Sequence, residues 1–241
     1  MILGKYRLTL LFLTPLILNA CGHMPDMDTG WKAYKADNFD KAYAHYSELA
    51  EFGVPRAKIE TGKILLYGKG SQDRDPERAL QLFEQAKAEG EIRLGNLYIP
   101  RAKAKLGSKI LKGEVQGYSD SEGLAMLKDA AATGDRTALF EMGYAYEKGL
   151  GVPVNGEKAA EYYAASGEKD YARGTFYQGQ LYMKGDIVPQ NIPKAVTLYE
   201  KAGEGGYPHA YKKLAQMYAE GKVVEANAQK AKVYKNMAAK S

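Results

Sequence analysis

The stretch ALFEMGYAYEKG, residues 138–149, decides the fold, because close copies of it recur along the chain. Each copy starts with a small residue and has a second small residue five positions later. An apolar or aromatic residue follows three positions on, and a glycine closes the copy. The copies are AKIETGKILLYG, AKAKLGSKILKG, ALFEMGYAYEKG, GTFYQGQLYMKG and AYKKLAQMYAEG, beginning at Ala57, Ala102, Ala138, Gly174 and Ala210. The last three begin 36 residues apart, and a fixed period of this length is typical of a repeat protein.

Each copy predicts a helix that packs closely on a neighbour. Small residues on one helical face allow another helix to approach, and a closing glycine suits the left-handed conformation that ends many helices. The second small residues of the copies are Gly62, Gly107, Gly143, Gly179 and Ala215.

A second helix is expected after each first one, because a good N-cap residue follows at a constant distance. The predicted caps are Asp75, Ser119, Asn155, Asn191 and Asn227. Ser119 and Glu122 have the spacing of a capping box, and Pro76 occupies a first helical position. Alanine follows most caps by four residues, and a large apolar residue comes one turn later at Phe83, Leu127, Tyr163 and Tyr199.

The segment 27–54 predicts an earlier, shorter helix pair. Its second helix would be capped at Asn38, with Ala42, Tyr46 and Leu49 on the inner stripe. Only twelve residues separate Gly30 from Ala42, against about sixteen in later repeats, a spacing closer to a tetratricopeptide repeat. The prediction is therefore an all-α protein, an α-solenoid of about six stacked antiparallel helix pairs from residue 27 to residue 240.

The pattern A-x4-G-x2-Y-x2-G, followed by a capped helix with A-x3-Y, resembles the Sel-like repeat family, which is related to tetratricopeptide repeats. The resemblance covers residues 55–241 and implies a protein-binding solenoid whose first helices line the concave face. One branch of that family closes each repeat with a disulfide, and a chain with a single cysteine cannot do so.

The repeat register contains an insertion near residues 91–101. Four residues normally join one pair to the next, but twelve separate Gly90 from Ala102. Two interpretations are open: a first helix that is lengthened and broken at Pro100, which we favour, or the remnant of an eroded repeat. Insertions in solenoids often lie on a binding face, and a neutral insertion is the alternative.

The N-terminal stretch LTLLFLTPLILNACGH contains Cys21, the only cysteine. A charged start, a short apolar run and a small residue before the cysteine predict a signal peptide over residues 1–20. The run Leu18 to Cys21 is similar to the lipobox of bacterial lipoproteins, which implies acylation of Cys21 and a short anchored linker over 21–26. Gly22 replaces the aspartate of inner-membrane lipoproteins, so this resemblance implies the outer membrane, with the body in the periplasm. The alternative is an ordinary signal peptide with a chance cysteine.

Charge and motifs argue against several classes of function. Loss of Lys5 and Arg7 with the signal peptide lowers the net charge from +5 to +3, too balanced to indicate nucleic-acid binding. None of His23, His45 and His209 has a partner at metal-ligand spacing, and no nucleophile elbow or P-loop is present. In YGKGSQDRDPE, residues 67–77, the glycines and Asp75 are expected to end and cap helices rather than bind phosphate or calcium. We therefore expect no enzyme, cofactor or metal.

Aromatic residues off the repeat positions are the candidate partner-binding residues: Phe140, Tyr144, Phe176 and Tyr177. The alternative is that they pack between repeats. The N-terminal pair also resembles outer-membrane lipoproteins of alginate biosynthesis. Together these features predict a scaffold for envelope proteins, such as an outer-membrane secretion barrel, in exopolysaccharide secretion. The alternatives are a surface-exposed lipoprotein that contacts host factors, or a regulator of a cell-wall enzyme.

Overall fold

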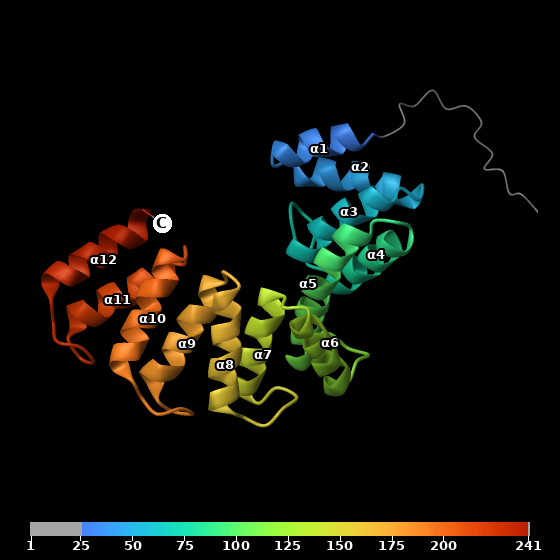
Figure 1. Cartoon of the computed structure of the whole chain (residues 1–241). Coiled ribbons are helices and arrows are strands. Elements are labelled where there is room, and N and C mark those ends of the chain that lie inside the picture. The colour runs from blue at the N-terminus through green and yellow to red at the C-terminus, as the bar shows by residue number, and fades with distance from the viewer. Residues whose placement is uncertain (1–25, 241) are drawn as a thin grey trace, which may run out of the picture.

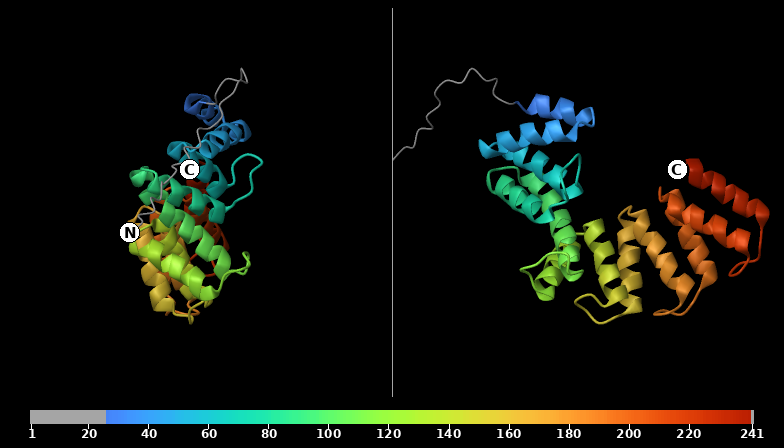
Figure 2. Two further views of the ribbon diagram at one scale, coloured as in Figure 1. Left: turned by 90° about the vertical axis from the view of Figure 1, so that its right-hand side faces the viewer. Right: turned by 180° about the vertical axis from the view of Figure 1, so that it is seen from behind.

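The computed structural model describes residues 26–240, which form twelve α-helices and no strand in that range (Figure 1). The helices are α1 (Met27–Lys35), α2 (Phe39–Glu51), α3 (Pro55–Tyr67), α4 (Pro76–Ala88), α5 (Ile92–Leu111), α6 (Asp120–Ala132), α7 (Arg136–Lys148), α8 (Gly156–Glu168), α9 (Ala172–Lys184), α10 (Ile192–Glu204), α11 (Pro208–Glu220) and α12 (Ala228–Lys240). They follow one another along an open curve that places α1 and α12 at opposite ends (Figure 2). The predicted all-α solenoid is confirmed.

Consecutive helices pack against each other throughout this curve, so each odd-numbered helix and the even-numbered helix after it form a pair. Among the first helices, α5 also contacts both α3 and α7. We call the side of the solenoid that carries the accessible side chains of the first helices the first-helix face.

The second helices begin at the predicted caps, because the cap side chains satisfy free backbone N–H groups. Oδ1 of Asn155 accepts from the amide of Lys158 at 2.9 Å, and Oδ1 of Asn191 accepts from the amide of Lys194 at 3.0 Å. The same bond is present at Asp75 and Asn227, and Ser119 forms the predicted capping box with Glu122.

Three pairs share a further contact between the tyrosine of the first helix and the start of the second. The amide of Asn191 donates to the carbonyl of Tyr182 at 2.8 Å, while the Lys194 ammonium lies 3.9 Å from the Tyr182 ring centre. Equivalent contacts join Tyr146 to the α8 cap and Tyr218 to the α12 cap. A backbone bond and a cation–π contact therefore hold each of these loops at both ends.

The predicted small anchor residues lie directly under large side chains of the second helix. A Cβ added at Gly143 would lie 2.7 Å from Cδ1 of Tyr163, and one added at Gly62 would lie 2.6 Å from Cε1 of Phe83. Gly179 has the same relation to Tyr199. Only glycine leaves room for a ring at this distance, which explains why the repeat keeps a small residue there.

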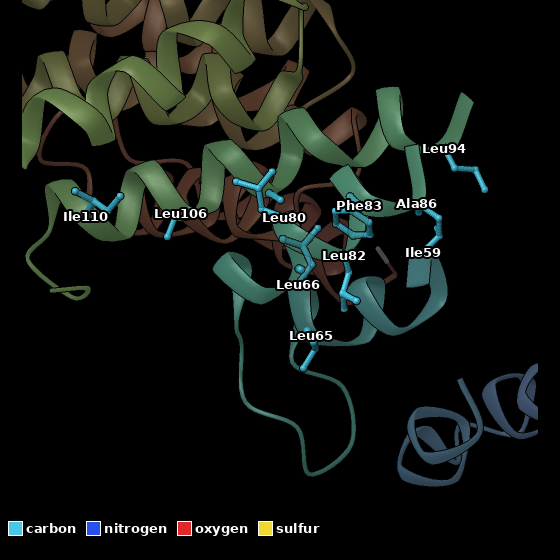
Figure 3. Close-up of a cluster of buried hydrophobic side chains, with 12 residues drawn as sticks. Ile59, Leu65, Leu66, Leu80, Leu82, Phe83, Ala86, Leu94, Leu106 and Ile110 are labelled. Carbon is cyan, nitrogen blue, oxygen red and sulfur yellow. The ribbon is translucent and has the colours of Figure 1, made fainter. Parts of the chain in front are cut away.

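The core is a succession of small apolar clusters between adjacent pairs rather than one central core, as expected of a solenoid. Figure 3 shows the cluster in which side chains of α3, α4 and α5 meet around Phe83. Similar clusters follow around Leu127, Tyr163 and Tyr199, all of which are fully buried.

The insertion near residues 91–101 lengthens α5 to 20 residues, against 13 in most other helices. The lengthened-helix interpretation is confirmed, but the expected break at Pro100 is wrong, because the helix continues through it. Proline removes one backbone hydrogen bond. Packing of the added turns offsets that loss: Leu94 is buried, and the Tyr98 ring stacks on Phe83 with 5.3 Å between centres.

Candidate functional site: the first-helix face

Two of the four predicted anchor residues do not lie on the surface. Phe140 is 2% exposed and Phe176 is 7% exposed, so the prediction of four surface aromatics is wrong at these two positions. Both residues stand three positions before an anchor glycine, as the buried Ile59 does before Gly62. In this position their rings pack against second-helix tyrosines, Phe140 against Tyr163 and Phe176 against Tyr199.

The other two predicted anchors, Tyr144 on α7 and Tyr177 on α9, are half-buried and reach the first-helix face. Two lysines flank the Tyr144 ring: the Lys112 ammonium lies 5.1 Å from its centre and that of Lys148 lies 5.8 Å away. The Arg173 guanidinium lies 5.4 Å from the centre of Tyr177. Tyr144 and Tyr177 are therefore each paired with a cation, and the negative face of an aromatic ring attracts such a charge.

The same pairing continues toward the N-terminal end of the face. The Lys63 ammonium lies between Tyr34 and Tyr98, 5.6 Å and 5.8 Å from their centres. On α5, the Lys105 ammonium lies 5.6 Å from the centre of Tyr67.

Sequence reasoning missed these pairings. Lys63, Lys105 and Lys112 contact tyrosines of other helices, which sequence does not show. Lys148 and Arg173 lie four residues from their tyrosines on the same helix, a spacing that could have indicated the contact.

Carboxylates on this face are held by neighbouring side chains. Glu60 is buried and pairs with Arg56 and Lys63, with N–O distances of 3.2 Å and 2.5 Å. Glu141 accepts a hydrogen bond from the Ser108 hydroxyl at 2.6 Å and lies 3.5 Å from the Lys112 ammonium. These acids are therefore already engaged within the protein.

The described residues offer no arrangement for metal binding, since no group of three or more His, Cys, Asp or Glu side chains in this part converges on one point. His45 is half-buried on α2, and His209 is exposed beside Tyr207 at the start of α11. Within residues 67–77, Gly68 ends α3 and Asp75 caps α4, as predicted. His23 and Cys21 lie outside the described residues, within which no helix has the length and apolarity to span a membrane.

A model of the Sel1 repeat matches residues 55–91, 137–171, 173–207 and 208–241, which is more than half of the chain. The chain belongs to the Sel1-repeat family. The matched segments cover α3–α4 and α7–α12, so the Sel1 repeats lie on both sides of the lengthened α5.

Three solved structures share this fold. A Sel1-repeat protein from Oxalobacter formigenes is similar with 24% identity and a TM-score of 0.61, over 90% of this chain and 88% of that one. The uropathogenic Escherichia coli protective antigen c5321 has 25% identity and a TM-score of 0.59; the match covers 82% of this chain but only 40% of c5321. The immunity protein PA5087 of Pseudomonas aeruginosa has 20% identity and a TM-score of 0.57, over 90% of this chain and 84% of that one.

Membership in the Sel1-repeat family indicates the general role of such a solenoid. Sel1-repeat proteins mediate protein–protein interactions, and the repeat is generally a non-catalytic scaffold. The first-helix face, with its accessible Tyr144 and Tyr177 and their flanking cations, is the candidate surface for such an interaction.

Proposed function

We propose that this protein is a lipid-anchored scaffold of the bacterial envelope that holds a partner protein on its first-helix face during exopolysaccharide secretion. The observation that carries the proposal is the pairing of accessible tyrosines with cations, at Tyr144 and Tyr177. Tyrosine and arginine are prominent among residues that dominate binding energy, because they combine large contact area with polar groups.

The buried Phe140 supports this surface from below. The Phe140 ring contacts Tyr177 edge-to-face with 5.0 Å between centres, and the Arg173 guanidinium lies 4.5 Å from the centre of the Phe140 ring. Tyr177 and Arg173 therefore both have a packing partner within the protein before any binding. Such preorganisation lowers the entropy cost of binding.

The binding surface can be tested by crosslinking partners in intact cells. Tyr144→Ala with Tyr177→Ala should abolish the crosslinked species while the protein stays folded. The matched control is Tyr43→Ala with Tyr162→Ala, which removes two half-buried tyrosines from the second helices α2 and α8. Equal loss in both variants, or no loss in either, would contradict a role for this face.

Anchoring rests on the resemblance of residues 18–21 to a lipobox. Two or more acyl chains hold a protein stably at a membrane, whereas one holds it only marginally. Cys21→Ala should therefore move the protein from the membrane to the soluble periplasmic fraction without changing its helical content. Retention of a processed mutant in the membrane would rule out the lipid anchor.

The link to exopolysaccharide rests on the N-terminal pair and on the proposed outer-membrane location. Deletion of the gene should reduce secreted polymer while polymer synthesis in the cell continues. Normal secretion in the deletion strain, under conditions in which the polymer is made, would remove this part of the proposal.

A second candidate is a surface-exposed lipoprotein that contacts host factors. The observation that favours it is the similarity to c5321, a protective antigen of uropathogenic Escherichia coli. Protease added to intact cells distinguishes the two locations, because it would digest a surface-exposed protein and leave a periplasmic one intact.

A further inference from the structure

A basic hollow of about 230 Å³ opens between the α3–α4 loop, α5 and α7. Four cations line it: Arg74 from the loop, Lys105 and Lys109 from α5, and Lys112 at the C-cap of α5. Glu114 and Glu141 are the acidic side chains in the lining, so the hollow carries an excess of positive charge.

The local structure directs these cations into the same space. Lys105 and Lys109 are four residues apart on one face of α5, although like charges at this spacing destabilise a helix, and Lys112 follows at the C-cap. Arg74 is held by a hydrogen bond of 3.3 Å from its Nε to the carbonyl of Tyr67. Gly68 has a φ of +61°, and a Cβ there would lie 2.6 Å from Cγ of Arg74, so the glycine leaves room for the arginine.

Two of the lysines lack a carboxylate partner. Glu141 is engaged by Ser108 and Lys112, and neither Lys105 nor Lys109 has a carboxylate oxygen within 4.0 Å among residues 26–240. Burial, together with the charge of Arg74, lowers the pKa of the Lys105 ammonium. An incoming anion would relieve this unfavourable environment, because an opposite charge favours the ionised lysine.

We infer that this hollow binds a carboxylate side chain of an acidic segment in the partner protein. The inference rests on the proposed scaffold function and names the chemistry of the partner. Lys112 joins the hollow to the tyrosine surface, because its ammonium lies near both Glu141 and the Tyr144 ring. One segment can therefore place a carboxylate in the hollow and a neighbouring residue against Tyr144.

An acidic polysaccharide fits this location less well. Sugars stack on aromatic faces, and no aromatic side chain lines the hollow; Leu66 and Pro76 are the apolar residues in its lining. Carboxylates of a peptide need only the cations, with which they form short charge-assisted hydrogen bonds.

The test measures binding of a fluorescent hexaglutamate peptide to the full chain in detergent micelles, by fluorescence anisotropy at low salt. Lys105→Gln with Lys109→Gln should weaken binding about tenfold or more, a change of about 1.4 kcal/mol. The matched control is Lys128→Gln with Lys201→Gln, which removes the same charge from exposed positions on α6 and α10 and should leave binding unchanged. Circular dichroism checks that each variant remains folded.

Several results would overturn the inference: no hexaglutamate binding by the wild type, equal weakening by both pairs of substitutions, or tighter binding of an oligouronate than of hexaglutamate. The outcome is separable from that of the proposed function. If Tyr144→Ala with Tyr177→Ala loses its crosslinked partners while Lys105→Gln with Lys109→Gln keeps them, the binding face stands and the carboxylate site falls.

Discussion

Replacement of Gly143 by alanine would place a methyl group against the ring of Tyr163. The added Cβ would lie 2.7 Å from Cδ1, 2.9 Å from Cε1 and 3.1 Å from Cγ of that ring. The ring has little freedom to move, because Tyr163 is fully buried and its hydroxyl donates to Glu147 at 2.8 Å. The contact must therefore be relieved by separating α7 from α8.

The magnitude follows from two opposing effects. Overpacking of a well-filled core costs about 1–3 kcal/mol. Alanine in place of glycine in a helix interior favours folding by about 1 kcal/mol. We therefore expect Gly143→Ala to lower the free energy of unfolding by about 1 kcal/mol. Substitution at Gly179 should cost less, because the added Cβ would lie 3.0 Å from Tyr199 and no group among residues 26–240 hydrogen-bonds the Tyr199 hydroxyl.

Urea denaturation followed by circular dichroism measures these changes, and a double-mutant cycle isolates the crowding. Tyr163→Leu reproduces the natural combination at Gly107 and Leu127, where leucine fills the place of the ring. In that background Gly143→Ala should become neutral or stabilising, which gives a coupling energy of about 1–3 kcal/mol. Equal stabilisation by Gly143→Ala in both backgrounds would refute the assignment of Gly143 as the contact point between α7 and α8.

Two further predictions concern the caps and the buried tyrosines. Asn191→Ala should lower the free energy of unfolding by about 1 kcal/mol, because it removes the bond to the Lys194 amide. Asn191→Asp should retain most of the wild-type stability, because its carboxylate can accept the same bond. Equal destabilisation by the two substitutions in the same urea assay would exclude a capping role. Burial raises the pKa of Tyr46 to about 12, whereas a tyrosine in the unfolded chain has a pKa of about 10. The folded state thus favours the protonated phenol, so stability should be constant below about pH 10 and fall as the pH rises toward 12. Tyr46→Phe should reduce this fall, and an unchanged profile in thermal melts would show that Tyr46 is not shielded.

The sequence by itself determined the elements that depend on short-range chemistry. N-caps such as Asn155 and Asn191 act on backbone groups three residues away, and closing glycines such as Gly149 act on the local chain direction. The anchor glycines were also predictable, because the small residue recurs at the same position of each copy, where the second helix packs against the first. These features fixed the helix boundaries and the order of the pairs.

Only the tertiary structure decided which aromatic residues are accessible and where charges converge. Phe140 and Tyr144 are four residues apart on α7, yet one is buried under α8 and α9 neighbours and the other reaches the surface. α5 continues through Pro100, and beside that proline Tyr98 stacks upon Phe83 of α4, a contact between different helices. Arg74 and Lys105 meet because the α3–α4 loop lies beside α5. Burial and charge density are set by contacts between distant residues, which no local pattern specifies.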